Sequence, residues 1–310
     1  MLSHMRLMGR YRMMSVLGSG AFATVWLAED PALETHVAVK VLADNWATNA
    51  DVRERFLAEA RLLRSSDNPR LVRVFDVGVS QDGEARPYFV MEYVPGGTLA
   101  DRIRGMSTRE ALEYGVAAAH AVQVLHDAGI VHRDVKPSNL LVDDRRTPPR
   151  VVVSDLGSAK LLAEASGITV TTGTPTYMAP EQIHQSNGFD ARADVYAVAA
   201  VTYHMLSGHP AFPERTAAEV AQRRVSSRPS ALAARLGQPA ALDRLLTRAL
   251  SWDPDRRPAT ASEFARGLEE VLAYAESPTR VREVATGPVL VLCVVLAVVF
   301  FLMTFFALSR

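Results

Sequence analysis

Five polar side chains that could do chemistry lie close together near the middle of the chain. In order, they are His132, Arg133, Asp134, Lys136 and Asn139. Apolar residues flank this cluster on both sides, and Pro137 inside it forbids a continuous helix or a central strand. We therefore predict a strand, a polar loop and a second strand over residues 130–142. Catalytic groups concentrate on loops that rigid elements hold, so this is a candidate catalytic loop, with a plain polar surface loop as the alternative.

Lysine is rare in this chain, although lysine and arginine together number 34. The lysines stand at Lys40, Lys136 and Lys160. Since the chain uses arginine where it merely needs positive charge, these lysines are candidates for positions that require a compact ammonium group. Lys40 ends the alternating run H-V-A-V-K, which is typical of a strand. A buried ammonium without a partner is costly, so we expect Lys40 to face a phosphate or a carboxylate.

The elements that must position these residues follow from hydrophobic periodicity and from glycine and proline. We expect a hairpin over residues 11–28, a helix over 51–64, strands over 71–79 and 88–94, a helix over 108–129 and a strand before Asp155. The hairpin turns at Gly18-Ser19-Gly20, where glycine lets backbone amides approach a phosphate closely. A Rossmann fingerprint is excluded, because a predicted strand and not a helix follows these glycines. The proline and glycines at residues 95–97 predict a hinge between two lobes.

The stretch H-R-D-V-K-P-S-N resembles the catalytic loop of the eukaryotic-type, or Hanks-type, protein kinases. Other matching stretches are G-S-G-A-F-A-T-V at 18–25, H-V-A-V-K at 36–40, D-L-G at 155–157, G-T-P-T-Y-M-A-P-E at 173–181, D-A-R-A-D-V-Y at 190–196 and D-P-D-R-R-P at 253–258. Two mild departures are Ala23, in place of the third glycine of the loop, and Ala199, in place of a later glycine. In having a lysine at position 136, the chain resembles the serine/threonine branch of the family.

The resemblance covers residues 11–274 and implies an α+β, two-lobed protein-kinase fold. The smaller lobe, residues 11–94, would be an antiparallel sheet with one helix, and the larger lobe, residues 95–274, would be mainly helical. The implied activity is transfer of the γ-phosphate of ATP to Ser or Thr hydroxyls of proteins, including the chain itself. A pseudokinase that serves as a nucleotide-binding signalling scaffold is one alternative. A small-molecule kinase of related fold is another, although such enzymes generally lack the G-T-x-x-Y-x-A-P-E segment.

The resemblance also implies a set of catalytic residues. Asp134 would receive the proton of the substrate hydroxyl, and Lys136 would contact the transferring phosphate. Lys40 would hold the phosphates of ATP, and Glu59, on the predicted helix, would hold Lys40. An ordinary solvated carboxylate is the alternative for Glu59.

A nucleotide site and a metal site are implied as well. Asn139 and Asp155 would bind magnesium, with manganese as the alternative ion. Met91 would be the gatekeeper beside the adenine, and the backbones of Glu92 and Val94 would meet its edge. The implied nucleotide contacts are Leu17, Gly18, Ser19, Gly20, Ala21, Phe22, Ala23, Thr24, Val25, Ala38, Lys40, Met91, Glu92, Val94 and Leu141.

Regulation would depend on three threonines that precede the G-T-P-T-Y-M-A-P-E stretch. These are Thr169, Thr171 and Thr172. A phosphate on one of them could pair with Arg133, because an arginine fork binds phosphate in a bidentate manner. The sequence does not rank the three threonines.

Other polar residues receive structural roles from the resemblance. Asp194 would brace the backbone of the catalytic loop, and Arg257 would pair with Glu181. His132 would pack beneath the metal-binding loop and take no part in acid–base chemistry. We expect His126 to be an ordinary helix residue, because no metal-ligand partner is spaced for it.

The end of the chain differs from the rest. Residues 275–287 form a short linker rich in proline, glycine and arginine, and residues 288–308 are almost unbroken apolar sequence. About 20 helical residues span roughly 30 Å, the thickness of a bilayer core. We therefore predict a single-pass anchor in the inner (plasma) membrane, with a buried soluble helix as the alternative. The kinase domain needs ATP and would be cytoplasmic, and residues 309–310 leave no sizeable extracellular domain.

Composition limits the remaining classes. The formal net charge of +0 argues against a nucleic-acid binder that relies on bulk electrostatics. The one cysteine, Cys293, excludes an internal disulfide framework and a Cys-rich metal site. We expect protein substrates, self-phosphorylation between molecules in a dimer, and no secretory signal over residues 1–16.

Overall fold

The computed structural model describes residues 7–81, 85–145, 150–156, 175–184 and 190–276 of the chain. The chain divides into two units, Met1–Leu272 and Ala273–Arg310. The fold described below is that of the first unit.

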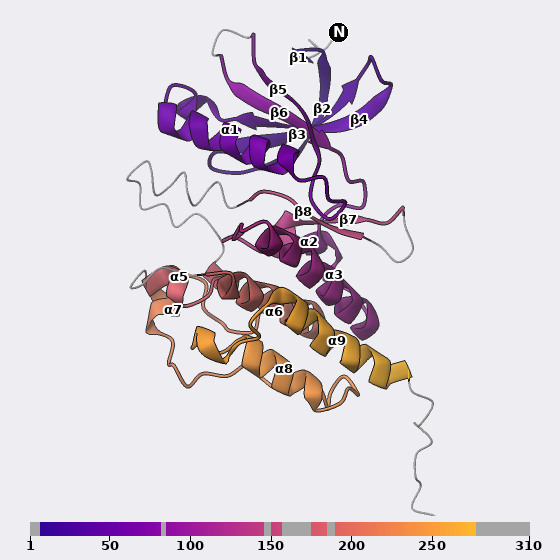
Figure 1. Ribbon diagram of the computed structural model, residues 1–310, viewed down its shortest axis with the longest axis vertical. Coiled ribbons are helices and arrows are strands. Elements are labelled where there is room, and N and C mark those ends of the chain that lie inside the picture. Colours follow the sequence, from indigo (N-terminus) through magenta and orange to yellow (C-terminus); the bar gives the residue numbers. More distant parts are fainter. Residues whose placement is uncertain (1–6, 82–84, 146–149, 157–174, 185–189, 277–310) are drawn as a thin grey trace, which may run out of the picture. The chain divides into compact units, whose positions relative to one another are not determined.

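Six antiparallel strands form the sheet lobe, in the order β1-β2-β3-β4-β6-β5 (Figure 1). Their bounds are Leu7–Met8 for β1, Tyr11–Ser19 for β2, Ala23–Asp30 for β3, Thr35–Leu42 for β4, Val74–Val79 for β5 and Pro87–Glu92 for β6. The helix α1, Ala50–Ser65, packs against β5 and β6. The predicted hairpin is confirmed as β2 and β3, and the predicted helix over 51–64 is confirmed as α1.

The alternation of β4 decides which side chains meet α1. Val39 and the other valines of this strand enter an apolar cluster together with Tyr88. Ala38 and Leu42 enter the other apolar cluster, which contains the buried residues of α1. Because successive strand residues point to opposite faces, Lys40 lies on the same face as Ala38 and Leu42 and is directed towards α1.

The helix α1 presents one buried face to the sheet. Its first turn is capped by Asn49, whose side chain accepts a hydrogen bond of 3.0 Å from the backbone N–H of Val52. The buried residues of the helix are Val52, Phe56, Glu59, Ala60 and Leu63. Glu59 follows Phe56 by three positions, so the helical period places this carboxylate on the apolar face, next to the sheet.

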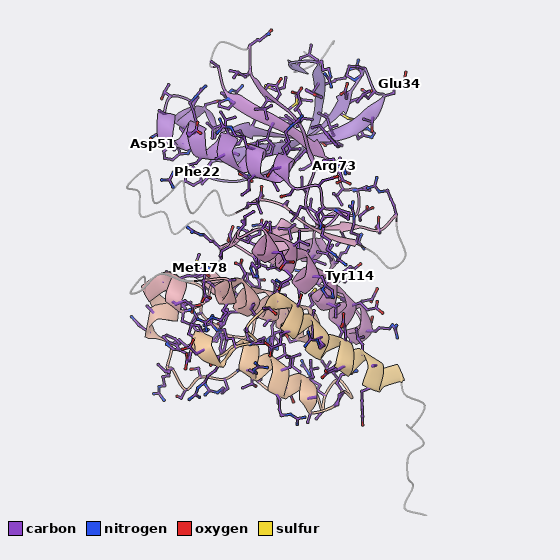
Figure 2. The ribbon with its side chains drawn as sticks, in the orientation of Figure 1. Phe22, Glu34, Asp51, Arg73, Tyr114 and Met178 are labelled. Carbon is purple, nitrogen blue, oxygen red and sulfur yellow. The ribbon has the colours of Figure 1, made fainter. Side chains whose placement is uncertain are left out.

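The second lobe is mainly helical, with one small two-stranded sheet. Its elements are α2 Leu99–Arg102, α3 Thr108–Asp127, β7 Leu140–Asp143, β8 Arg150–Val153, α5 Glu181–His184, α6 Arg192–Ser207, α7 Ala217–Gln222, α8 Ala241–Ala249 and α9 Ala261–Glu276. Short 3-10 turns occur in both lobes. The turn η1, Asp44–Trp46, lies in the sheet lobe, and the turns of the second lobe are η2 Pro137–Asn139, η3 Pro175–Tyr177 and η4 Pro254–Arg256. The helix α3 packs against α6 and β8, and Tyr114 on α3 belongs to the core (Figure 2). The predicted two-lobed α+β fold is confirmed.

The connection between the lobes is held against β7. The backbone N–H of Val142 donates a hydrogen bond of 2.9 Å to the carbonyl of Gly97, which has a φ of 73°. At Gly96, an added Cβ would collide with the carbonyl oxygen of Val142. Glycine is therefore required at both positions, in one case for its backbone conformation and in the other for space.

The predicted strand before the catalytic loop was wrong. The helix α3 ends instead with Gly129 at a φ of 74°, and the N–H of Ile130 donates a hydrogen bond of 2.9 Å to the carbonyl of Leu125. Ile130 packs against the apolar core without joining a strand, so its apolar character reflects burial and not sheet pairing. The second predicted strand is confirmed as β7.

Two other strand boundaries also differ from the prediction. The strand β5 begins at Val74 and not at residue 71, because Leu71 forms an isolated parallel bridge with Val153 of β8. The strand β6 ends at Glu92, before the hinge.

The predicted membrane span, residues 288–308, lies outside the described residues, as do residues 277–287 of the predicted linker. Within the described ranges, no helix is both long enough and apolar enough to cross a membrane.

Candidate active site

A buried ammonium with two carboxylate partners lies between β4 and α1. The Nζ atom of Lys40 is 2.9 Å and 3.0 Å from the two carboxylate oxygens of Glu59 and 2.7 Å from Oδ1 of Asp155. Lys40 is 6% exposed and Glu59 is 4% exposed. The strand alternation of β4 and the helical period of α1 bring the first pair together. The solvated alternative for Glu59 is thereby excluded.

The charges of Lys40 and Asp155 shift each other's pKa. Burial alone lowers the pKa of Lys40, but the carboxylates of Asp155 and Glu59 outweigh burial, and the net shift is upward. Burial alone raises the pKa of Asp155, but the Lys40 ammonium outweighs it and the net shift is downward. Lys40 and Asp155 are therefore held in their charged forms.

The catalytic loop brings Asp134, Lys136 and Asn139 together. The Lys136 ammonium lies 2.7 Å from Oδ2 of Asp134. The amide nitrogen of Asn139 donates to the backbone carbonyl of Asp134 at 2.9 Å and to its Oδ2 at 3.2 Å. Asp134 is thus held in place by its two neighbours, and the turn η2, which Pro137 begins, sets their spacing.

Asp194, at the start of α6, holds the backbone of this loop. Its carboxylate accepts hydrogen bonds from the N–H of His132 at 2.7 Å and from the N–H of Arg133 at 2.9 Å. The ring of His126 contacts the same carboxylate at 3.0 Å. The sequence predicts an ordinary helix residue at His126. Its position four residues after the buried Val122 is the signal that places it on the inner face of α3.

His132 connects the catalytic loop to the end of β8. The ring is fully buried, and its Nε2 lies 3.1 Å from the backbone carbonyl of Ser154. The N–H of Asp134 donates to Nδ1 of His132 at 3.3 Å, so we assign the ring proton to Nε2. Both ring nitrogens of His132 are therefore engaged in contacts with the backbone.

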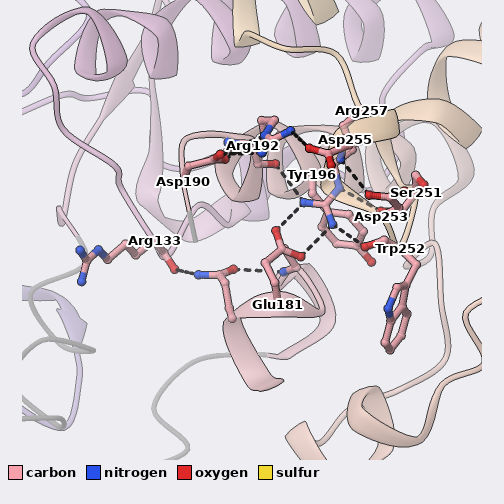
Figure 3. Close-up of polar contacts among 12 residues, drawn as sticks. Arg133, Glu181, Asp190, Arg192, Tyr196, Ser251, Trp252, Asp253, Asp255 and Arg257 are labelled. Carbon is pink, nitrogen blue, oxygen red and sulfur yellow. Dashed lines mark hydrogen bonds and ion pairs between the residues drawn. The ribbon is translucent and has the colours of Figure 1, made fainter. Parts of the chain in front are cut away.

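Two non-glycine residues of the site have positive φ angles, which L residues rarely adopt. These are Arg133, at 70°, and Asp155, at 53°. The backbone of Arg133 is fixed on both sides, because its N–H donates to Asp194 and its carbonyl accepts a hydrogen bond of 2.9 Å from Gln182. Figure 3 labels Arg133 and draws the contact at its carbonyl. Such conformations persist where surrounding contacts determine them, and they are frequent in active sites.

A polar cavity of about 450 Å³ joins these groups to the glycine-rich loop. It is lined by the residues from Leu17 to Ala23, by Val25, and by Lys40, Asp134, Lys136, Asn139 and Asp155, among others. At the tip of the loop, Phe22 stacks on Trp46 with ring centroids 5.1 Å apart, and the indole N–H of Trp46 donates to the carbonyl of Ala21. The loop is therefore anchored to η1 (Figure 2 labels Phe22).

An apolar pocket of about 270 Å³ adjoins this cavity. Its lining includes Ala38, Met91, Glu92, Val94 and Leu141, and it shares Leu17, Gly18, Val25 and Asp155 with the polar cavity. Of the residues expected to contact a nucleotide, Thr24 is the exception, since it lines neither space. Ala23 and Val25 point into the cavity, so the strand alternation of β3 directs Thr24 to the opposite face.

The donor set suits a nucleotide and a hard divalent cation. Asn139 uses its amide nitrogen on Asp134, which leaves the amide oxygen for a cation next to the carboxylate of Asp155. No group of three or more His, Cys, Asp or Glu residues that could hold a metal occurs in the described part of the chain. An ion here would therefore need further oxygen ligands, and phosphates in the same cavity could supply them.

An arginine–carboxylate pair supports the segment beyond the catalytic loop (Figure 3). The guanidinium of Arg257 donates to the two oxygens of Glu181 at 2.6 Å and 2.8 Å, and it is 2% exposed. It also donates to the carbonyls of Ser251 and Trp252, at 2.9 Å and 3.1 Å. The structure therefore contains the pair that was expected from the sequence.

Three threonines were expected from the sequence to regulate activity. Thr169, Thr171 and Thr172 lie outside the described residues, so their expected approach to Arg133 is untested.

Residues 11–267 match the protein kinase domain. The chain belongs to the protein kinase family. Bacterial serine/threonine kinases are among its relatives. Serine/threonine-protein kinase PknB of Mycobacterium leprae is 35% identical over 270 residues, which are 84% of this kinase chain and 43% of the relative. Serine/threonine-protein kinase PknF of Mycobacterium tuberculosis is 35% identical over 275 residues, which are 86% and 57%.

Solved structures give the same assignment. The kinase domain of Mycobacterium tuberculosis PknI superposes with a TM-score of 0.66 and 27% identity, covering 88% of this kinase chain and all of that domain. This kinase chain spans about half the length of the curated relatives it matches. What those longer proteins act on is therefore not transferred here.

The Asp194 contacts generate a first prediction. In an Asp194→Asn variant, an amide NH2 group replaces one of the two carboxylate oxygens. This group cannot accept a hydrogen bond from a backbone N–H, so one of the two backbone donors loses its partner. We expect backbone amides at His132 and Arg133 to exchange with solvent about ten- to hundredfold faster, because an unsatisfied buried group costs about 1–3 kcal/mol. Hydrogen exchange of peptides that cover this loop measures the effect. Asp190→Asn is the matched control, and equal exchange in both variants would contradict the bracing role.

Proposed function

We propose that the chain is an ATP-dependent protein serine/threonine kinase whose kinase domain covers residues 11–274. The observation that carries the proposal is the arrangement around Asp134. Its carboxylate is held by Lys136 and Asn139 at the wall of the cavity that also contains the charged Lys40 and Asp155. Membership of the protein kinase family supports this activity.

In the proposed mechanism, residues of the chain position the reactants and stabilise charge. Asp134 accepts the proton of a substrate Ser or Thr hydroxyl, and Lys136 beside it stabilises negative charge on the transferring group. Lys40 binds the phosphates, and Glu59 fixes its ammonium from the α1 side. When bound, ATP and a divalent ion supply the phosphoryl group and neutralise the charge that develops on its oxygens.

Asn139 and Asp155 are the residues that would hold the divalent ion, which we propose to be magnesium, with manganese as the alternative. Their amide and carboxylate oxygens are hard ligands, as magnesium requires. The apolar pocket under Met91 and Leu141 would take the adenine. The N–H of Glu92 already donates to the carbonyl of Arg73 at 2.8 Å, so the carbonyl is the Glu92 backbone group proposed to face the base.

The decisive experiment replaces the proposed base. An Asp134→Asn variant should transfer phosphate from ATP to Ser or Thr about 10²–10⁴ times more slowly, the scale of a lost general base. Transfer of labelled phosphate measures the rate, and nucleotide binding should persist. Asp67→Asn, at a surface aspartate paired with Arg73, is the control. Unchanged transfer in Asp134→Asn would refute the assignment, and nucleotide binding without transfer in the wild type would favour the scaffold alternative.

We also propose that phosphorylation of the segment before Gly173 activates the enzyme. A phosphate adds about two negative charges and three acceptors, enough to order a loop around Arg133. A variant with alanine at positions 169, 171 and 172 should be folded and slow. Mass spectrometry should map phosphate to this stretch in the wild type, whereas full activity of the alanine variant would count against the switch.

The apolar run at residues 288–308 supports a further proposal, a membrane anchor with the kinase domain in the cytoplasm. A helix of this length satisfies its backbone internally and matches one bilayer. Anchoring would concentrate the chains in two dimensions and so favour phosphorylation between molecules. We expect the full chain to stay in the membrane pellet during an alkaline carbonate wash and a chain ending at Glu276 to be washed off. Equal release of both forms would contradict the anchor.

A further inference from the structure

A second hollow, of about 440 Å³, opens beside the catalytic loop. It shares Ala100, Lys136 and Ser138 with the polar cavity described above, so the two spaces are contiguous. Lys136 lies 2.7 Å from Asp134. A protein chain that presents a hydroxyl to Asp134 would therefore place neighbouring side chains at the mouth of this hollow.

Apart from Arg104 and Lys136, the residues that line the hollow are apolar or neutral. Ile103 and the buried Pro137 form part of the lining. Opposite chain segments contribute Tyr177 and His204, whose rings are stacked with centroids 6.0 Å apart and whose Oη and Nδ1 atoms are 2.7 Å apart. Burial raises the pKa of Tyr177 to about 12, and burial lowers the pKa of His204. Both side chains are therefore neutral near pH 7, and they pair with each other.

Arg104, which follows α2, gives the hollow its charge. Its side chain is exposed, and within the described residues its guanidinium makes no hydrogen bond or ion pair. The other cation of the lining, Lys136, is already paired with Asp134. The lining contains no carboxylate among the residues described, and the nearby Asp101 caps α2 through Thr98 and lines the nucleotide cavity instead.

We propose that this hollow, the Arg104 subsite, receives an acidic side chain of the protein substrate close to the Ser or Thr that is phosphorylated. The ligand chemistry is a carboxylate of Asp or Glu or the phosphate of a previously phosphorylated residue, since an arginine fork binds both. Arg104 is then a specificity-determining residue. The inference rests on the proposed kinase function and names the substrate class for it.

The length of the peptide chain limits where the acidic residue can lie, and its ion pair with Arg104 determines how much it raises kcat/KM. An extended chain advances about 3.3–3.6 Å per residue, so the acidic residue belongs within about four positions of the acceptor. An exposed ion pair is weak, and the apolar residues Ile103 and Pro137 line the same hollow as Arg104. We expect one acidic residue at the preferred position to raise kcat/KM about three- to tenfold over alanine, and less at high salt.

The test uses the full chain in detergent and peptides with one central threonine. Each of the four positions on either side carries Ala, Asp, phosphoserine or Arg in turn, and the ratio of kcat/KM for each peptide to that of the all-alanine peptide is measured. The wild type should favour Asp and phosphoserine at one position. Arg104→Ala should reduce that ratio to about one, Arg104→Lys should retain part of it, and Arg104→Glu should favour arginine there. The Asp and phosphoserine arms distinguish the two sources of negative charge.

Arg244→Glu is the matched control, because Arg244 is an exposed arginine of α8 and the change in net charge is the same. This variant should keep the wild-type ratios. Equal acidic preference in the wild type and Arg104→Ala, or a wild type that phosphorylates neutral and acidic peptides alike, would overturn the Arg104 subsite while the kinase function stands. A wild type that transfers phosphate to no peptide and not to itself would overturn both.

Discussion

The bond between Lys40 and its two carboxylates is the constraint on which the site depends. One ammonium, 6% exposed, is the partner of Glu59 on α1 and of Asp155 beyond β8. Removing Lys40 would leave the buried carboxylate of Glu59 without its cation, which is far more costly than the net value of the intact group. A single side chain thus connects α1 and Asp155 to the sheet.

In the helical lobe, a buried negative charge holds neighbouring segments together, as the positive charge of Lys40 does at the sheet. Asp194 is buried, and its carboxylate gathers the N–H groups of His132 and Arg133 and the ring of His126. These donors come from the end of α3 and from the loop that follows it. A loop has no ladder of its own hydrogen bonds, so buried side chains must satisfy its backbone. The backbone position of the loop around Asp134 therefore depends on α6, which carries Asp194, and on α3, which carries His126.

Much of this arrangement could be predicted from the sequence, because the residues concerned break local rules. A lysine in a chain that otherwise uses arginine, at the end of an alternating strand, indicated a need for an anionic partner. Glu59 lies on the apolar face of a periodic helix, where a carboxylate must be paired. Family resemblance supplied the partners that lie far apart in the sequence, such as Glu181 and Arg257. The contact between Lys40 and Asp155, 115 residues apart, was not predicted, since no local pattern encodes it.

The errors had physical causes too. Ile130 is apolar because it covers the core after the end of α3, and an apolar residue before a polar loop looks the same whether it pairs in a sheet or packs. Thr24 lines neither cavity, because strand alternation turns its side chain away from those of its neighbours, and its contact with a nucleotide stays a prediction. The role of His126 was not predicted, because a single histidine in a helix carries little information. Its ring contacts the carboxylate of Asp194, which lies 68 residues away in the sequence.

The positive φ angles of Arg133 and Asp155 have a consequence for how the protein loses its structure. A left-handed backbone costs an L residue about 1–2 kcal/mol, so each of these residues would return to an ordinary conformation if released. Arg133 is kept in place by Asp194 on α6 and by Gln182 on α5. The loop consequently has no independent stability: its geometry lasts as long as the helices around it and fails with them. We therefore expect heat inactivation and melting of the helical core to occur together, as one cooperative event.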